Sequence, residues 1–312
     1  MREPSRVTVA VPVYNEATVV PELLARILAV IDAIPGGPHE IIFVDDGSSD
    51  RTFELLAQAC KRDSRLVAIN LSRNFGHQAA LTAALEMATG DVVVVMDGDL
   101  QDPPEAIPRL LEEYRRGYDV VYAVRTGRKE GLFLRVCYYL FYRMIALLAH
   151  VDLPIGAGDF GLMSRQVVDC IRGMRERSPY LRGLRAWVGF SQTGVPIERA
   201  QRHSGDSKYN WGKLLQLAFD GIFSFSLVPV RIALLTGALA IAASLGYATY
   251  SVAAKLAYHQ SPRGFTALIV AITFLSGVQL LFLGIIGEYA GRIFDEVRQR
   301  PRYVVRQIVG RP

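Results

Sequence analysis

Polar, mostly acidic turns follow three short apolar stretches of this 312-residue chain. Residues 12–16 read PVYNE, residues 45–50 read DDGSSD and residues 97–102 read DGDLQD. One Asp-Gly turn after a strand is ordinary turn chemistry, but three such turns at the carboxyl ends of neighbouring strands predict one shared crevice. The Asp97-Gly98-Asp99 turn offers hard oxygen ligands for Mg²⁺ or Mn²⁺, which can bridge a diphosphate and stabilise it as a leaving group.

Two common phosphate-binding motifs are missing from the sequence. No G-x-G-x-x-G follows the first apolar stretch, which argues against a dinucleotide cofactor. No G-x-x-x-x-G-K-[ST] occurs either, which excludes a P-loop enzyme. The phosphates of a substrate must therefore be bound in another way.

The elements that position these turns alternate between strand and helix. Strands are predicted at 7–13, 40–44, 66–70, 92–96 and 119–124, and helices at 17–34, 52–60, 78–88 and 104–116. Such alternation predicts an α/β domain with a mostly parallel sheet and helices on both faces. The acidic turns then fall at the carboxyl ends of strands, where such sheets bind ligands.

Composition excludes several classes of protein. The chain is 51% hydrophobic with ordinary glycine and proline counts, which excludes disorder and collagen-like structure. The three cysteines, Cys60, Cys137 and Cys170, are scattered and odd in number, so they indicate neither a disulfide framework nor a zinc site. A net charge of +5 on so apolar a chain favours an anionic membrane surface or phosphorylated substrates over DNA.

The hydrophobicity is concentrated in two uncharged runs, Ile232 to Ala254 and Phe265 to Gly287. Each is long enough to cross a bilayer, and a short loop joins them, so we expect a transmembrane hairpin. The alternative is a buried helix pair in a soluble core. Arginines are frequent after Gly291 and scarce in the loop, which predicts that the N-terminal domain and the tail are cytoplasmic. Residues 1–6 do not begin a signal peptide.

These motifs, in this order, resemble the family 2 glycosyltransferases with the GT-A, Rossmann-like fold. The resemblance extends through RTGR at 125–128, GAGDF at 156–160, which precedes a short strand, and RHSGDSKY at 202–209. Together with the two spans, the pattern is similar to the polyprenyl-phosphate glycosyltransferases of the bactoprenol glucosyltransferase type, which are related to dolichol-phosphate mannose synthase. The Q-x-x-R-W motif of the polymerising branch is absent, which argues for transfer of a single sugar.

The resemblance implies roles for individual residues. It places Pro12, Tyr14, Asn15, Glu16, Asp45, Asp46 and Arg125 at the nucleotide sugar, and Asp97, Asp99 and Gln101 at the metal, with Asp99 favoured as a direct ligand. For Asp46, Ser48 and Ser49, turn formation and helix capping are an equal alternative. The implied phosphate-binding and acceptor residues are Arg128, Arg135, Arg202, Ser207 and Lys208. Any one of the arginines or Lys208 alone could also be a solvated surface charge.

Asp159 is the candidate nearest the reacting sugar, and Asp99, Asp159 and Arg202 form the implied catalytic set. A lipid phosphate is largely dianionic at pH 7, because its second pKa is near 6, so it needs no general base. Asp159 could therefore bind sugar, position the acceptor, act as a modest base, or simply cap a helix.

Two further segments are expected to lie in the membrane interface. Residues 132–149 and 209–225 are apolar and aromatic with few charges, which is typical of amphipathic interfacial helices. The alternative for both is an ordinary core helix. Three regions follow: a cytoplasmic GT-A domain over 1–225, two transmembrane helices within 226–290 and a basic cytoplasmic tail over 291–312.

The expected activity is inverting transfer of one hexose to undecaprenyl phosphate at the cytoplasmic membrane face. Glucose from UDP-glucose is the first donor, with GDP-mannose, UDP-GlcNAc and UDP-4-amino-arabinose as rivals, and Mg²⁺ or Mn²⁺ as the metal. The alternatives are another lipid acceptor or a membrane scaffold without activity. Nucleic acid is not expected as a partner, and the resemblance implies a homotetramer.

Overall fold

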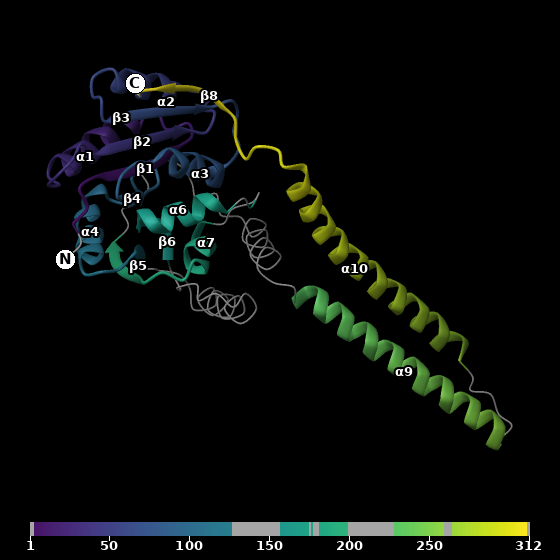
Figure 1. Ribbon diagram of the computed structural model, residues 1–312. Helices are drawn as coiled ribbons and strands as arrows, with labels where there is room; N and C mark the ends of the chain where they lie inside the picture. Colours follow the sequence, from purple (N-terminus) through teal and green to yellow (C-terminus); the bar gives the residue numbers. More distant parts are fainter. Residues whose placement is uncertain are drawn as a thin grey trace. The chain divides into compact units, whose positions relative to one another are not determined.

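A computed structural model describes residues 3–126, 157–174, 176, 181–198, 228–258 and 264–310 of the chain (Figure 1). The chain divides into two compact units. The first contains the sheet with its helices and includes the C-terminal residues from Arg300 onward. The second contains two long helices and is described separately below.

The first unit is built on one eight-stranded sheet in the order β7-β5-β6-β4-β1-β2-β3-β8. Its strands are β1 (Val7–Val13), β2 (Glu40–Asp45), β3 (Leu66–Leu71), β4 (Val92–Val95), β5 (Val120–Thr126), β6 (Ala157–Ser164), β7 (Gln192–Glu198) and β8 (Val305–Val309). Only β6 and β8 run antiparallel to their neighbours, so among the described strands the sheet is mostly parallel, as predicted.

Helices cover both faces of the sheet because side chains alternate along the buried strands. In β1, Val9 and Val11 pack into one core while Ala10 packs into the other. The first core includes α1 (Val20–Asp32), α2 (Thr52–Cys60) and α4 (Ile107–Arg115), which follows the short 3₁₀ turn η1 (Pro104–Ala106). The second includes α3 (His77–Met87), α6 (Arg165–Gly173) and α7 (Leu181–Trp187).

The observed elements match the predicted ones in position up to β5, with boundary shifts of one to three residues. One expectation is corrected. Asp159 was expected to precede a short strand, with helix capping as an alternative role, but it lies within β6, and Ser164 caps the following helix α6. A short polar segment rich in glycine gives a weak strand signal, because sheet pairing rather than its own composition holds it extended.

The C-terminal residues also differ from the expected tail over 291–312. Helix α10 continues to Arg298, and β8 then pairs antiparallel with β3 at the edge of the sheet. The strand is followed by Gly310 at φ +97°, where an added Cβ would lie 2.1 Å from the carbonyl oxygen of Leu66. Only glycine fits this close approach, so Gly310 allows the backbone after β8 to pack directly against the start of β3.

The second unit consists of α9 (Val228–Tyr258) and α10 (Phe265–Arg298), which contact each other. Their large apolar side chains are exposed: Leu239, Phe274 and Leu280 are 64%, 69% and 69% exposed. Within the described residues, the stretch Phe274–Arg298 of α10 has the length and composition to cross a membrane. In α9, the corresponding apolar stretch, Leu235–Tyr250, is shorter. The expected interfacial segments, 132–149 and 209–225, lie outside the described residues.

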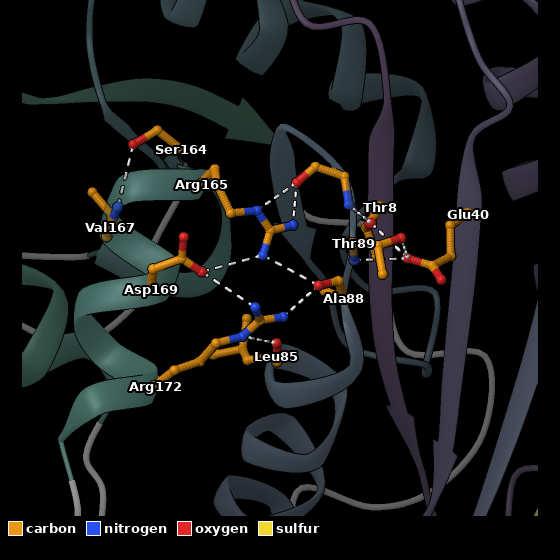
Figure 2. A network of polar contacts seen from close by, with 11 residues as sticks. Thr8, Glu40, Leu85, Ala88, Thr89, Ser164, Arg165, Val167, Asp169 and Arg172 are labelled. Carbon is orange, nitrogen blue, oxygen red and sulfur yellow. Dashed lines mark hydrogen bonds and ion pairs between the residues drawn. The ribbon is translucent and has the colours of Figure 1, made fainter.

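Two arginines of α6, Arg165 and Arg172, bind the carbonyl groups at the C-terminal end of α3 (Figure 2). This end of the helix lies at the end of the sheet opposite the acidic turns. Arg165 Nε donates to Gly90 O at 2.9 Å, and Arg172 Nε donates to Leu85 O at 2.7 Å. Both guanidinium groups also donate to Ala88 O, and Asp169 lies between them. The last carbonyls of a helix lack partners within the helix and carry partial negative charge, so these arginines fix the C-terminus of α3.

We expect Arg172→Met to lower the free energy of unfolding by about 1–3 kcal/mol, because it leaves α3 carbonyls without their charged donor. Thermal unfolding followed by circular dichroism measures the change. Arg51→Met is the matched control, since Arg51 is exposed and pairs only locally with Glu54. Equal melting temperatures for the two variants would contradict this role.

Candidate active site

The turns after β1 and β2 are joined by hydrogen bonds into one surface. The backbone N–H of Asn15 donates to Ser48 Oγ at 2.9 Å, and the N–H of Ser49 donates back to Asn15 Oδ1 at 2.9 Å. Glu16 N–H donates to Thr52 Oγ1 at the start of α2. Asn15 has φ +55°, a conformation that asparagine tolerates better than most residues. The PVYNE and DDGSSD segments therefore form a single wall.

Asp45 and Asp46, at the end of β2, are almost completely buried. Asp46 accepts hydrogen bonds from the backbone N–H groups of Phe75 at 2.7 Å and Gly76 at 2.9 Å. Asp45 accepts from Ser48, and burial raises the pKa of both carboxyl groups. These contacts support the turn-forming role for Asp46 and Ser48, and a direct ligand role for either remains a prediction.

The third turn lies against the end of β1 because Gly98 permits close approach. A Cβ added to Gly98 would lie 2.6 Å from Val13 Cγ1 and 3.0 Å from Pro12 O. Asp99 Oδ1 accepts from the N–H of Gln101 at 3.1 Å, across Leu100 at φ +57°. Asp97, Asp99 and Gln101 are thus placed beside the PVYNE segment.

Asp97 and Asp159 face each other across two neighbouring strands. The last register pair of β4 and β6 is Val95 with Gly161. Two residues after Val95 and two residues before Gly161, the same antiparallel register brings Asp97 opposite Asp159. His77, the first residue of α3, lies between them, with Nε2 3.5 Å from Asp97 Oδ1 and 3.8 Å from Asp159 Oδ2.

Helix α7 supplies cations to Asp159. Arg182 donates through Nε at 2.6 Å and through Nη2 at 2.7 Å to the two carboxylate oxygens, which is fork geometry. Arg185 is buried, donates to Gly158 O at 3.3 Å and lies over the ring of Tyr122. The first residue of α7, Leu181, donates its N–H to Gln78 Oε1, which ties α7 to α3.

The two carboxyl groups have opposite pKa shifts. Burial, reinforced by the charges of Asp159, Asp102 and Asp99, raises the pKa of Asp97 to about 6 despite the opposing effect of His77. Burial also acts to raise the pKa of Asp159, but Arg182, with His77 and Arg185, lowers it to about 2. Asp159 is consequently a fixed anion, while Asp97 titrates near neutral pH.

The donor set of the third turn fits a divalent cation bound together with a diphosphate. No group of three or more His, Cys, Asp or Glu residues gathers as a metal site within the part of the chain that the structure describes. Mg²⁺ is commonly held by only one or two carboxylates, with phosphate oxygens and waters completing its shell. Asp97 and Asp99 meet that requirement.

The structure brings most of the predicted residues to one edge of the sheet. These are Pro12, Tyr14, Asn15, Glu16, Asp45, Asp46, Asp97, Asp99, Gln101 and Asp159. Arg125 lies on β5, close to that strand's carboxyl end. Arg128, Arg135, Arg202, Ser207 and Lys208 lie outside the described residues.

Sequence reasoning did not identify His77, Arg182 or Arg185 as site residues. His77 follows the carboxyl end of β3, so the rule that selected the acidic turns also applies to it. For Arg182 and Arg185 the sequence carries no comparable signal, because α7 reaches the site through the tertiary fold and not through an adjacent strand.

Comparison with known proteins agrees with this fold. Residues 8–172 match the family described as "Glycosyl transferase family 2", and residues 228–293 match "GtrB C-terminal hairpin". The chain is 35% identical to the "Prophage bactoprenol glucosyl transferase homolog" of Escherichia coli, covering 97% of this chain and 99% of the relative. It is 37% identical to the "Undecaprenyl-phosphate 4-deoxy-4-formamido-L-arabinose transferase" of Pseudomonas paraeruginosa, covering 97% and 90%.

A solved structure has the same fold at low sequence identity. The mannosyltransferase PcManGT of Pyrobaculum calidifontis, in complex with GDP-Man and Mn²⁺, superposes with a TM-score of 0.53 at 20% identity, covering 96% of this chain and 87% of that one. The expected GT-A architecture is thereby confirmed.

We expect Asp97→Asn to stabilise the protein at pH 8 in the presence of a chelator, by about 1–3 kcal/mol. The folded-state pKa of Asp97 lies above its ordinary value, so its ionised form opposes folding; this penalty is complete above pH 6 and decreases as the pH falls from about 6 to about 4. Melting temperatures at pH 8 and pH 5 measure the effect. A gain that is equal at both pH values would argue against a titrating Asp97.

We expect Arg182→Met to lower the free energy of unfolding by about 2–4 kcal/mol, because it leaves the buried Asp159 carboxylate without its cation. Adding Asp159→Asn should recover a large part of this loss, and Arg182→Lys should fall between wild type and Arg182→Met. Urea unfolding of these four proteins and of Asp159→Asn alone provides the comparison. Strictly additive effects of the two substitutions would exclude a direct energetic coupling.

Proposed function

The chain belongs to glycosyl transferase family 2, and from that premise we propose that it transfers a single hexose, with inversion, to undecaprenyl phosphate or a similar polyprenyl phosphate. The observation that carries the proposal is the combination, in one chain, of the cluster of carboxylates at the sheet edge with two long helices whose apolar side chains are exposed. The first binds a sugar donor from water, and the second suits an acceptor that resides in lipid.

The proposed donor is UDP-glucose. The Escherichia coli relative named for glucosyl transfer to bactoprenol supports glucose. The similarly close relative named for a 4-formamido-arabinose supports a UDP-linked arabinose substituted with nitrogen at C4 as the second candidate, and UDP-4-amino-arabinose and its N-formyl derivative are both to be tested. GDP-mannose and UDP-GlcNAc complete the panel of donors to be tested.

The walls of the crevice suit the two parts of such a donor. The nucleoside is proposed to lie along Pro12, Tyr14, Asn15 and Glu16, with Asp45 at the base or ribose. Tyr14, with 47% of its surface exposed, offers an aromatic face for this purpose. Asp97 and Asp99, with Gln101 beside them, are the residues that would hold Mg²⁺ or Mn²⁺. When bound, the metal would stabilise charge on the departing diphosphate.

Asp159 is proposed to position the reacting groups as a permanent anion, not to accept a proton. A carboxylate with a pKa of about 2 is a weak base at neutral pH, and Arg182 occupies both of its oxygens. The acceptor phosphate needs no base, because it is largely dianionic at pH 7. One of its oxygens attacks the anomeric carbon as the bond to the diphosphate breaks, and this inverts the configuration.

The cationic residues named from the sequence, together with Ser207, are proposed to bind the two phosphate groups. Arg125, Arg128, Arg135, Arg202, Ser207 and Lys208 are assigned to the donor diphosphate or to the acceptor, with Arg202 in the catalytic set. Arginine suits bidentate phosphate contacts. We place the enzyme in the cytoplasmic membrane as a two-span protein with its crevice on the cytoplasmic side, following the excess of arginine after Gly291.

The activity is tested by transfer of radiolabelled glucose from UDP-glucose to undecaprenyl phosphate, with purified full-length protein, detergent and Mn²⁺. We expect labelled lipid from wild type, loss of product on chelation, and an activity at least about 100-fold lower for Asp99→Ala, because the diphosphate then leaves with its charge poorly stabilised.

Asp32→Ala is the matched control, since Asp32 is an exposed carboxylate at the C-terminal end of α1, at the end of the sheet opposite the acidic turns. It should retain full activity. Product with another donor of the panel, but none with UDP-glucose, would change the sugar and keep the mechanism. No product with any donor or lipid would favour a membrane scaffold without activity.

A further inference from the structure

The strand that follows the hairpin reaches the loop beneath the nucleotide site. We propose that residues Val304–Arg306 are a positioning segment for donor binding, which acts by holding residues 72–76 in the conformation that fixes Asp46. The inference rests on the proposed function in one respect, namely that this crevice binds a nucleotide.

The C-terminal residues form hydrogen bonds with Ser72, the residue directly after β3. The N–H of Ser72 donates to Val304 O at 2.8 Å, and its carbonyl oxygen accepts from Arg306 Nη2 at 2.9 Å. Both backbone polar groups of Ser72 are therefore held by the C-terminal residues. The preceding residue, Leu71, pairs with Val305 in the sheet register.

The second step is the connection from Ser72 to the site. A Cβ added to Gly47 would lie 2.3 Å from the carbonyl carbon of Arg73, so the DDGSSD turn rests directly on this loop. Three residues beyond Ser72, the N–H groups of Phe75 and Gly76 donate to Asp46. The loop is thus fixed by the tail at one end and by Asp46 at the other.

The third step is the continuation of the loop into α3. Gly76, at φ +98°, precedes His77, which lies between Asp97 and Asp159. A glycine in this region adopts many conformations at little cost, so the loop needs external contacts to stay in one of them. The C-terminal residues supply such contacts through Ser72. A displacement of Ser72 would therefore change the positions of both Asp46 and His77.

Other tail contacts reach different parts of the fold and provide a matched comparison. Arg302 Nη2 donates to Met174 O, after α6, and Tyr303 donates its hydroxyl to Glu86 near the end of α3. If the tail only covered the open edge of β3, loss of Arg302 or Arg306 would have equivalent effects. If the tail positions the loop, only Arg306 acts on the site.

Hydrogen–deuterium exchange of the full-length protein tests this without a substrate. In Arg306→Ala we expect faster exchange of the amides of Phe75 and Gly76, by about threefold to tenfold, as the loss of one hydrogen bond implies. Arg302→Ala should leave these amides unchanged, and Arg306→Lys should restore part of their protection. Unchanged amides in Arg306→Ala, or equal acceleration in Arg302→Ala, would overturn the proposal.

Calorimetric titration with UDP and Mn²⁺ then measures the consequence for the site. We expect the Kd for UDP to rise about threefold to tenfold in Arg306→Ala and to stay unchanged in Arg302→Ala. An unchanged Kd in Arg306→Ala would overturn the positioning role. If wild type does not bind UDP, the proposed donor fails, and the exchange measurement alone decides the inference.

Discussion

The constraint on which the site depends is the close approach of two carboxylates, the buried Asp159 and the half-buried Asp97. The register of β4 and β6 brings Asp97 opposite Asp159, so two negative charges come close together, one of them buried, and nearby positive charge is needed to stabilise them. His77 of α3 lies near both carboxylates, Arg182 of α7 donates to Asp159, and the buried Arg185 of α7 lies close by. The hydrogen bond from Leu181 N–H to Gln78 Oε1 links the two helices.

The same cations separate the two acids by function. Arg182 holds Asp159 ionised across the physiological range, whereas Asp97 retains a pKa of about 6. Two acids whose environments push their pKa values apart can take different roles in one site. Here Asp159 is a fixed negative charge, and the pKa of Asp97 lies closer to neutral pH.

The sequence predicted those parts of the fold that depend on local pattern. The strands up to β5 and the three turns alternate so regularly that their order alone places the turns at one edge of the sheet. Asp159 was identified as a residue, but its place inside β6 was not, because pairing with β4 and β5 holds that glycine-rich segment extended. Arg182 and the strand β8 were missed because each acts on residues distant in the chain, and no local spacing records such a partnership.

The position of β8 in the chain also has a consequence for biosynthesis. The strand is made after both long helices, so β3 has no partner on that edge while the hairpin is being synthesised. An unpaired edge strand is a site for wrong pairing and aggregation. The pairing of β8 with β3 can therefore form only after both apolar helices have been synthesised. The folding of this domain is completed after synthesis of the hairpin.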